Sequence, residues 1–100
     1  MTGYSYHPAA VQEIVEAVRY YEERAPGLGK ELRAELDDAV LLLRQVPEAA
    51  APIREGLRRK PLRRFPFALI YAVEDSEIRI YAVSHRRRRP GYWLDRLPLI

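Results

Sequence analysis

The first half of the chain repeats its apolar residues at the spacing of a helix. Two stripes occur, one of Val11, Ile14, Val15, Val18 and Tyr21, and one of Leu32, Leu36, Ala39, Val40, Leu43 and Val46. Pro8 suits the first turn of a helix, where its missing N–H has no partner, and Pro47 stops the second stripe. Between the stripes, Pro26–Gly29 permits a tight reversal. The pattern therefore predicts two antiparallel helices joined by a short loop, an α-hairpin.

The second half of the chain alternates bulky and light residues with the period of a strand. The alternation runs from Phe65 to Val73 and again from Ile78 to Ser84, with the polar residues 74–77 between them, which predicts a β-hairpin. Upstream, Leu57 to Arg64 predicts a basic outer strand, and Tyr4 to His7 predicts a brief N-terminal strand. The order β-α-α-β-β-β predicts an α+β fold, in which an N-terminal short strand and an α-hairpin pack on a small antiparallel sheet. We expect residues 1–100 to form a single domain.

The alternation gives the two faces of the predicted sheet different partners. The bulkier face is expected to lie under the helices, and it consists of Phe67, Leu69, Tyr71, Ile78 and Ile80. The other face is expected to be open, and it carries Ala68, Ile70, Ala72, Arg79, Tyr81, Val83 and, at the strand end, His85. Since this second face is more polar and is flanked by arginines, we predict that it is the functional one.

Composition excludes several classes of protein and site. The chain has no cysteine, which rules out disulfides, a thiol nucleophile and a thiolate zinc site, and makes the cytoplasm the expected compartment. Its first residues lack the pattern of a signal peptide, and no apolar run approaches the roughly 20 residues of a membrane span. His7 and His85 are far apart in the sequence and have no acidic cluster beside them. We therefore expect no metal and no other cofactor.

Charge divides the chain into two halves of opposite sign. Residues 1–50 hold five basic and nine acidic side chains, and residues 51–100 hold twelve basic and five acidic ones. The net charge of +3 thus conceals halves of −4 and +7. We expect the acidic half to be a solvated helical face, with Glu13, Glu16 and Glu23 off the first apolar stripe. The basic half favours an anionic partner, either a nucleic acid or an acidic protein.

The second half also holds the candidate functional side chains. The run Arg86–Arg89 fits a phosphate or carboxylate contact, because guanidinium groups bind both bidentately, and it also fits a solvated segment. A second basic group, which a sheet could bring near the first, consists of Arg58, Arg59, Lys60, Arg63 and Arg64. His85 fits a proton-transfer group or a strand-end histidine. Tyr92 and Trp93 fit a cover over the edge of the core, a base-stacking pair or a protein contact.

Several short motifs, in this order along the chain, resemble those of the RelE/ParE toxin family. They are His7–Ala10, Tyr20–Glu23 and Pro26–Gly29 in the helical half, and Arg64–Tyr71, Ile80–His85 and Arg88–Trp93 in the sheet and tail. The resemblance covers nearly the whole chain and is closest to the ParE-like, plasmid-stabilisation branch. It implies the toxin of a bacterial type II toxin–antitoxin system, with a helical hairpin on a small antiparallel sheet. A cognate antitoxin is expected to neutralise it.

The resemblance implies two alternative targets. ParE relatives poison DNA gyrase, whereas RelE relatives cut mRNA on the ribosome and place an arginine on the central strand, where this chain has Ala68. Since alanine carries no charge, growth inhibition by binding gyrase is favoured, and no catalytic residue is firmly assigned. A ribosome-dependent mRNA endonuclease would use His85, Arg87 and Tyr92. A third alternative is a non-toxic family member that only binds its antitoxin.

The family's antitoxins wrap the toxin and bind operator DNA through a domain of their own. Operator DNA is therefore expected as a partner only indirectly, through the antitoxin, and no membrane contact is expected. The residues expected to bind the target or the antitoxin are Arg64, Arg79, Tyr81, His85, Arg86, Arg87, Arg88, Arg89, Tyr92 and Trp93.

Overall fold

The computed structural model describes residues 1–54 and 56–98, and its elements largely match the predicted ones. In chain order they are β1 (Tyr4–Tyr6), α1 (Pro8–Arg24), α2 (Leu28–Gln45), β2 (Ala51–Arg54), β3 (Leu57–Pro61), β4 (Phe67–Glu74), β5 (Glu77–His85) and a short 3-10 helix, η1 (Leu94–Arg96). Strand β2 is an addition to the predicted order. It contains Pro52 and is exposed along its whole length, so it has no apolar alternation by which the sequence could reveal it.

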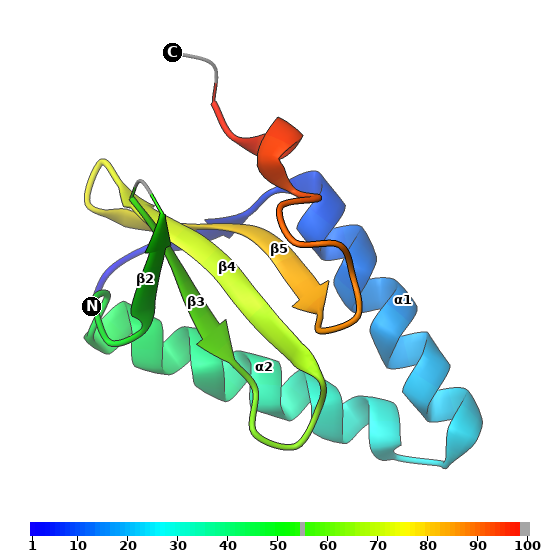
Figure 1. Cartoon of the computed structure of the whole chain (residues 1–100). Helices are drawn as coiled ribbons and strands as arrows, with labels where there is room; N and C mark the ends of the chain where they lie inside the picture. Colours follow the sequence, from blue (N-terminus) through cyan, green and yellow to red (C-terminus); the bar gives the residue numbers. More distant parts are fainter. Residues whose placement is uncertain (55, 99–100) are drawn as a thin grey trace.

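The strands form one sheet in the order β1-β5-β4-β3-β2, and the α-hairpin covers one of its faces (Figure 1). All neighbouring strands pair antiparallel except β1, which runs parallel to β5 at the edge of the sheet. The predicted α+β fold, a helical hairpin on a small sheet, is confirmed, with one parallel pair in an otherwise antiparallel sheet. Neither helix in the described part of the chain is long and apolar enough to cross a lipid bilayer.

Local chemistry sets the ends of the hairpin helices. His7 caps α1, since its Nδ1 accepts a hydrogen bond from the Ala9 amide at 3.0 Å, and Pro8 occupies the first turn. Gly27 precedes α2 with a φ of 87°, a conformation that favours glycine. At Gly29 a Cβ would lie 2.5 Å from the Val18 carbonyl oxygen, so only glycine lets the two helices approach this closely.

The core under the helices is formed mainly by the residues that the sequence predicts. It includes Leu32, Leu36 and Leu43 of α2, together with Leu69 and Tyr71 of β4. The stripe of α1, however, is rotated from the predicted one, and its buried residues are Ala10, Ile14 and Ala17. Val11 and Val15 are instead 44% and 42% exposed. The two alanines bring α1 close to β5, which leaves the valines on its outer surface; Val46 lies beyond the end of α2 and is also exposed.

A bulge in β5 changes the predicted assignment of the sheet faces. Ile70 pairs with Ala82 but its neighbour Tyr71 pairs with Ile80, so Tyr81 is an extra residue in β5. Beyond a single inserted residue the alternation reverses. Val83 therefore packs in the core under the helices, and the His85 ring lies 5.0 Å from that of Phe67 on the same side. The prediction that Val83 and His85 lie on the open face is wrong, because periodicity alone does not reveal a bulge.

The far face of the sheet is covered. Its apolar cluster contains Ile70, Ala72, Tyr81 and Ala82, and the C-terminal segment closes over it. Trp93 belongs to this cluster and is only 6% exposed, with Tyr92 and Leu97 packed beside it. The prediction of an open face is therefore wrong, because the segment after β5 folds back over the face and supplies the missing apolar cover.

Candidate functional site

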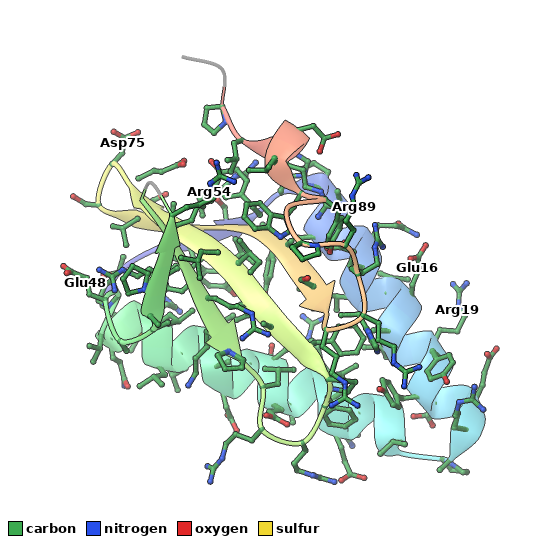
Figure 2. The ribbon with its side chains drawn as sticks, in the orientation of Figure 1. Glu16, Arg19, Glu48, Arg54, Asp75 and Arg89 are labelled. Atoms are coloured by element: carbon green, nitrogen blue, oxygen red, sulfur yellow. The ribbon has the colours of Figure 1, made fainter. Side chains whose placement is uncertain are left out.

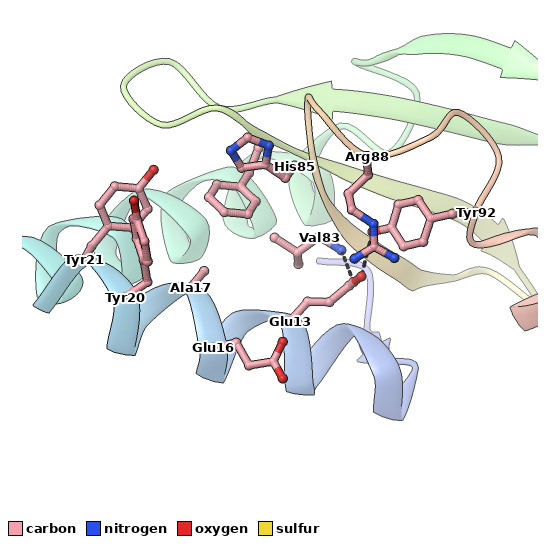
Figure 3. A pocket seen from close by; sticks show the side chains of 10 residues that line it. Glu13, Glu16, Ala17, Tyr20, Tyr21, Val83, His85, Arg88 and Tyr92 are labelled. Carbon is pink, nitrogen blue, oxygen red and sulfur yellow. Dashed lines mark hydrogen bonds between the residues drawn. The ribbon is translucent and has the colours of Figure 1, made fainter. Parts of the chain in front are cut away.

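A single carboxylate, that of Glu13 in α1, holds the segment that follows β5. Its Oε1 accepts hydrogen bonds from the Val83 amide at 2.9 Å and from Arg96 Nη1 at 2.9 Å. Its Oε2 accepts from the Tyr92 hydroxyl at 2.6 Å and from Arg96 Nη2 at 3.0 Å (Figure 3 shows Glu13 with Val83 and Tyr92). The Arg96 fork is therefore bidentate, the strongest form of this ion pair. We call Glu13, Tyr92 and Arg96 the Glu13 clamp.

The Glu13 clamp is largely shielded from solvent. The side chains of Glu13 and Arg96 are 13% and 14% exposed. The hydrogen bond to Glu13 is the main reason that the pKa of Arg96 is raised. Burial, and then the bond to the Glu13 carboxylate, raises the pKa of Tyr92 to about 12. Arg96 is therefore charged and the Tyr92 phenol neutral over the whole physiological pH range.

The run Arg86–Arg89, which we call the arginine loop, is a folded turn rather than a free segment. The Arg86 amide donates to the Pro66 carbonyl at 2.9 Å, the Arg87 amide to His85 Nδ1 at 3.0 Å, and the Arg88 amide to the His85 carbonyl at 3.0 Å. The Arg88 guanidinium lies 3.9 Å from the centre of the Tyr92 ring. Its position thus depends on a ring that the Glu13 clamp holds.

The bond from Arg86 to Pro66 places Arg63 and Arg64 of the second basic group near the arginine loop. Pro66 lies in the β3–β4 loop, two residues after Arg64, so the arginine loop and this second loop meet at one end of the sheet. Within residues 1–54 and 56–98, the ion pairs are Arg33–Asp37, Arg58–Glu48, Arg64–Glu31 and Arg96–Glu13. The four guanidinium groups of the arginine loop are thus unpaired in that part of the chain.

A pocket of about 400 Å³ separates α1 from the arginine loop (Figure 3). Its lining is Glu13, Glu16, Ala17, Tyr20, Tyr21, Phe67, Val83, His85, Arg88 and Tyr92. Burial, together with the charges of Arg87 and Arg86, lowers the pKa of His85 and so favours its neutral form. Because its Nδ1 accepts a hydrogen bond, the ring proton is assigned to Nε2. Chemically, the pocket offers aromatic walls, an N–H donor, one guanidinium and, at its rim, the Glu16 carboxylate.

The structure gathers some of the predicted site residues and separates others. His85, Arg88 and Tyr92 line the pocket together. Arg64 lies in the neighbouring loop and pairs with Glu31 at 2.7 Å. Arg79 lies near the start of β5 and donates a hydrogen bond to Ser5 Oγ of the edge strand β1 at 3.2 Å.

Two of the predicted residues are buried on the far face. Tyr81 is 2% exposed and donates its hydroxyl to Glu74, and Trp93 lies in the same apolar cluster. Both side chains therefore act in packing as the molecule stands, and a partner reaches them only if the C-terminal segment moves.

Of the residues predicted for a ribonuclease, the structure brings His85 and Tyr92 to one pocket. Arg88, and not Arg87, lines the pocket with His85 and Tyr92. The Tyr92 hydroxyl donates to Glu13, and its pKa of about 12 makes it a poor proton donor at neutral pH. Ala68 of β4 is completely buried, with β3 and β5 as its neighbouring strands.

Sequence reasoning missed both charged members of the clamp. Glu13 was expected on the solvated face, but it lies three residues after Ala10 and four before Ala17, on the flank of the stripe that is buried. The sequence predicts that Glu13 lies on this flank only when the buried stripe of the helix is already known. Arg96 follows Asp95, outside the arginine run, and no local motif identifies it as the partner of a residue in the first helix.

The outer surface of the α-hairpin forms a second candidate site. A groove of about 460 Å³ there is lined by Ile14, Val15, Val18, Arg19, Glu22, Glu23 and Arg33, and we call it the helix groove. Arg19, which lines this groove, points outward from α1 (Figure 2). An apolar floor flanked by charges is the chemistry that an amphipathic helix requires.

No group of three or more histidine or acidic side chains within residues 1–54 and 56–98 is arranged to hold a metal ion.

Comparisons with known proteins agree on one family. A family model described as the ParE toxin of the type II toxin–antitoxin system parDE matches residues 4–90. Toxin ParE2 of Mycobacterium tuberculosis strain CDC 1551 / Oshkosh is 33% identical over 86 residues, which cover 85% of this chain and 82% of the relative. Toxin ParE2 of strain ATCC 25618 / H37Rv gives the same values.

A solved structure gives the same result for the fold. It is described as the chromosomal ParDE TA system from P. aeruginosa, and it matches with a TM-score of 0.68 at 24% identity. The match covers 85% of this chain and 96% of that one.

Proposed function

The chain belongs to the ParE toxin family of type II toxin–antitoxin systems, and we propose that it inhibits bacterial growth by binding DNA gyrase. The observation that carries the proposal is the arginine loop, a folded turn whose four guanidinium groups have no ion-pair partner in the described part of the chain. Such a loop suits the recognition of carboxylates or phosphates on a larger partner. The proposed contact surface combines the arginine loop with the adjacent Arg63 and Arg64.

Binding rather than catalysis is supported by the state of the pocket. An RNA-cleaving site needs groups that remove and donate a proton near the scissile phosphate. Of the two pocket residues predicted for a ribonuclease, His85 and Tyr92, the Tyr92 hydroxyl already donates to Glu13, which leaves His85 as the free member of that pair. The buried Ala68 adds no charge on the central strand.

Family membership implies an antitoxin partner, and we propose that the antitoxin neutralises the toxin by placing an amphipathic helix in the helix groove. Val15 lines the groove and is exposed, and Val11, four residues before it on α1, is exposed as well. Arg19 would bind acidic residues of that helix, while Glu23 would bind basic ones.

The target is tested by adding the purified protein to DNA gyrase holoenzyme in a supercoiling assay. We expect inhibition, and we expect the triple variant Arg87→Ala, Arg88→Ala, Arg89→Ala to lose most of it. The matched control, Arg19→Ala, Arg24→Ala, Arg33→Ala, loses the same charge from the helices and should inhibit like the unaltered protein.

Two results would contradict the proposed target. The first is unimpaired supercoiling at micromolar protein. The second is cleavage at the ribosomal A site, detected by primer extension on mRNA from induced cells, which would assign the endonuclease function instead. Continued growth after induction without antitoxin would favour the non-toxic alternative.

A further inference from the structure

Glu13 joins the two ends of the segment that contains the arginine loop. On the side before the loop, its Oε1 accepts the Val83 amide in β5. On the side after the loop, its two oxygens accept the Tyr92 hydroxyl and the Arg96 guanidinium. One carboxylate on α1 thus closes the loop across residues 83 to 96, which places the arginines between its two points of attachment.

The Glu13 clamp reaches one arginine in particular. Glu13 fixes the Tyr92 ring through its hydroxyl, and the Arg88 guanidinium lies 3.9 Å from the centre of that ring. A guanidinium that rests on an aromatic face loses less conformational freedom when it binds a partner than one that samples solvent. Arg88 also lines the pocket, so its position relative to α1 depends on Tyr92.

Glu16 provides the natural comparison within the same pocket. It lies three residues after Glu13 on α1, lines the pocket as well, and points outward (Figure 2). The four hydrogen bonds that close the loop go to Glu13 and not to Glu16. The two carboxylates therefore contribute the same charge to the pocket but differ in their attachment to the loop.

We propose that Glu13 is a positioning residue for target binding: it acts through Tyr92 to hold Arg88 in the orientation in which the arginine loop meets its anionic partner. This inference rests on the proposed function of the arginine loop. It assigns the acidic first helix a role in presenting the basic surface, beyond being a solvated face.

The positioning itself is tested without any partner, by the rate at which trypsin cleaves within the arginine loop. Glu13→Gln keeps the shape of the side chain but removes the charge that Arg96 binds, and Tyr92→Phe removes only the bond between Glu13 and the ring. Both variants should be cleaved within residues 86–89 about tenfold faster than the unaltered protein, because local opening of the loop becomes easier. Circular dichroism verifies that each variant is folded, and Glu16→Gln is the control, which should be cleaved at the original rate.

The role in binding is tested by a double-mutant cycle on gyrase inhibition. We expect Glu13→Gln and Arg88→Ala each to weaken inhibition by about tenfold, and the double variant to be no weaker than either alone. In an Arg87→Ala background, Glu13→Gln should retain its full effect, because Glu13 does not act through Arg87.

Each remaining outcome overturns a stated part of the proposal. Unchanged cleavage in both Glu13→Gln and Tyr92→Phe would show that the clamp does not hold the loop. An equal effect of Glu13→Gln with and without Arg88 would show that Glu13 does not act through Arg88. If the unaltered protein fails to inhibit gyrase, the proposed target is wrong and binding through Arg88 falls with it, while the cleavage rates still decide whether Glu13 holds the loop.

Discussion

The two faces of the sheet are buried by different means. Under the helices, large apolar side chains of α1, α2 and the central strands form a wide core, with Leu36 and Tyr71 almost fully buried. On the far face, the short C-terminal segment covers a smaller cluster around Trp93, and a largely buried ion pair between Glu13 and Arg96 holds it in place. The difference teaches that the first cover is inseparable from folding, whereas the second can be loosened by removing a few polar contacts.

The largest expected effect comes from the helix-covered face. Leu36→Ala should reduce the free energy of unfolding by about 3 kcal/mol, because it removes a buried side chain and leaves a cavity between α2 and the sheet. Urea denaturation followed by circular dichroism measures this loss. A change below about 0.5 kcal/mol, the range of surface substitutions, would show that this face does not carry the stability assigned to it.

A smaller effect is expected from the polar cover of the far face. Arg96→Met should reduce the free energy of unfolding by about 2 kcal/mol, because it leaves the Glu13 carboxylate largely buried without its charged partner. Without this ion pair, the C-terminal segment should also expose Trp93, the one tryptophan in the sequence, to solvent. The fluorescence of Trp93 should then shift to longer wavelength. Arg33→Met is the control, because its pair with Asp37 is exposed and should contribute less than about 0.5 kcal/mol. An equal loss of unfolding free energy in the two variants would contradict the expectation that the buried ion pair contributes more to stability than the exposed one.

The smallest effect is expected from alkaline pH. Tyr92 has a pKa of about 12 in the folded protein, above the value of about 10 for an unfolded tyrosine, so folding favours its neutral form. Its contribution to stability is therefore complete below pH 10 and is lost as the pH rises toward 12. The unaltered protein should lose more of its unfolding free energy between pH 8 and pH 11 than Tyr92→Phe does. Parallel losses in the two proteins would contradict a shifted Tyr92, since the remaining tyrosines are common to both.

Much of the fold follows from local pattern. The α2 stripe from Leu32 to Leu43, the helix start at Pro8 and the turn at residues 74–77 are each read from a few neighbouring residues, and each is confirmed. The family resemblance, read from short motifs in order, is confirmed by the family model and by Toxin ParE2. The individual target- and antitoxin-binding residues remain predictions.

The errors arise where two distant segments meet. Helical spacing alone permits α1 to bury either Val11 and Val15 or Ala10 and Ala17, and the close approach of β5 favours the alanines. The bulge at Tyr81 is equally invisible in the sequence, yet it moves Val83 and His85 to the other face.

The sequence by itself determined both long helices, every strand except β2, their order, the family and the division of charge, because these depend on local spacing and on short motifs. Only the tertiary structure decided which face of α1 is buried, that the far face is covered, and that Glu13 meets Arg96 across a separation of 83 residues in the chain. The physical reason is that a carboxylate has the same local signature whether it is solvated or buried. Its role depends on which donors the fold brings to it, and here those donors come from the opposite end of the chain.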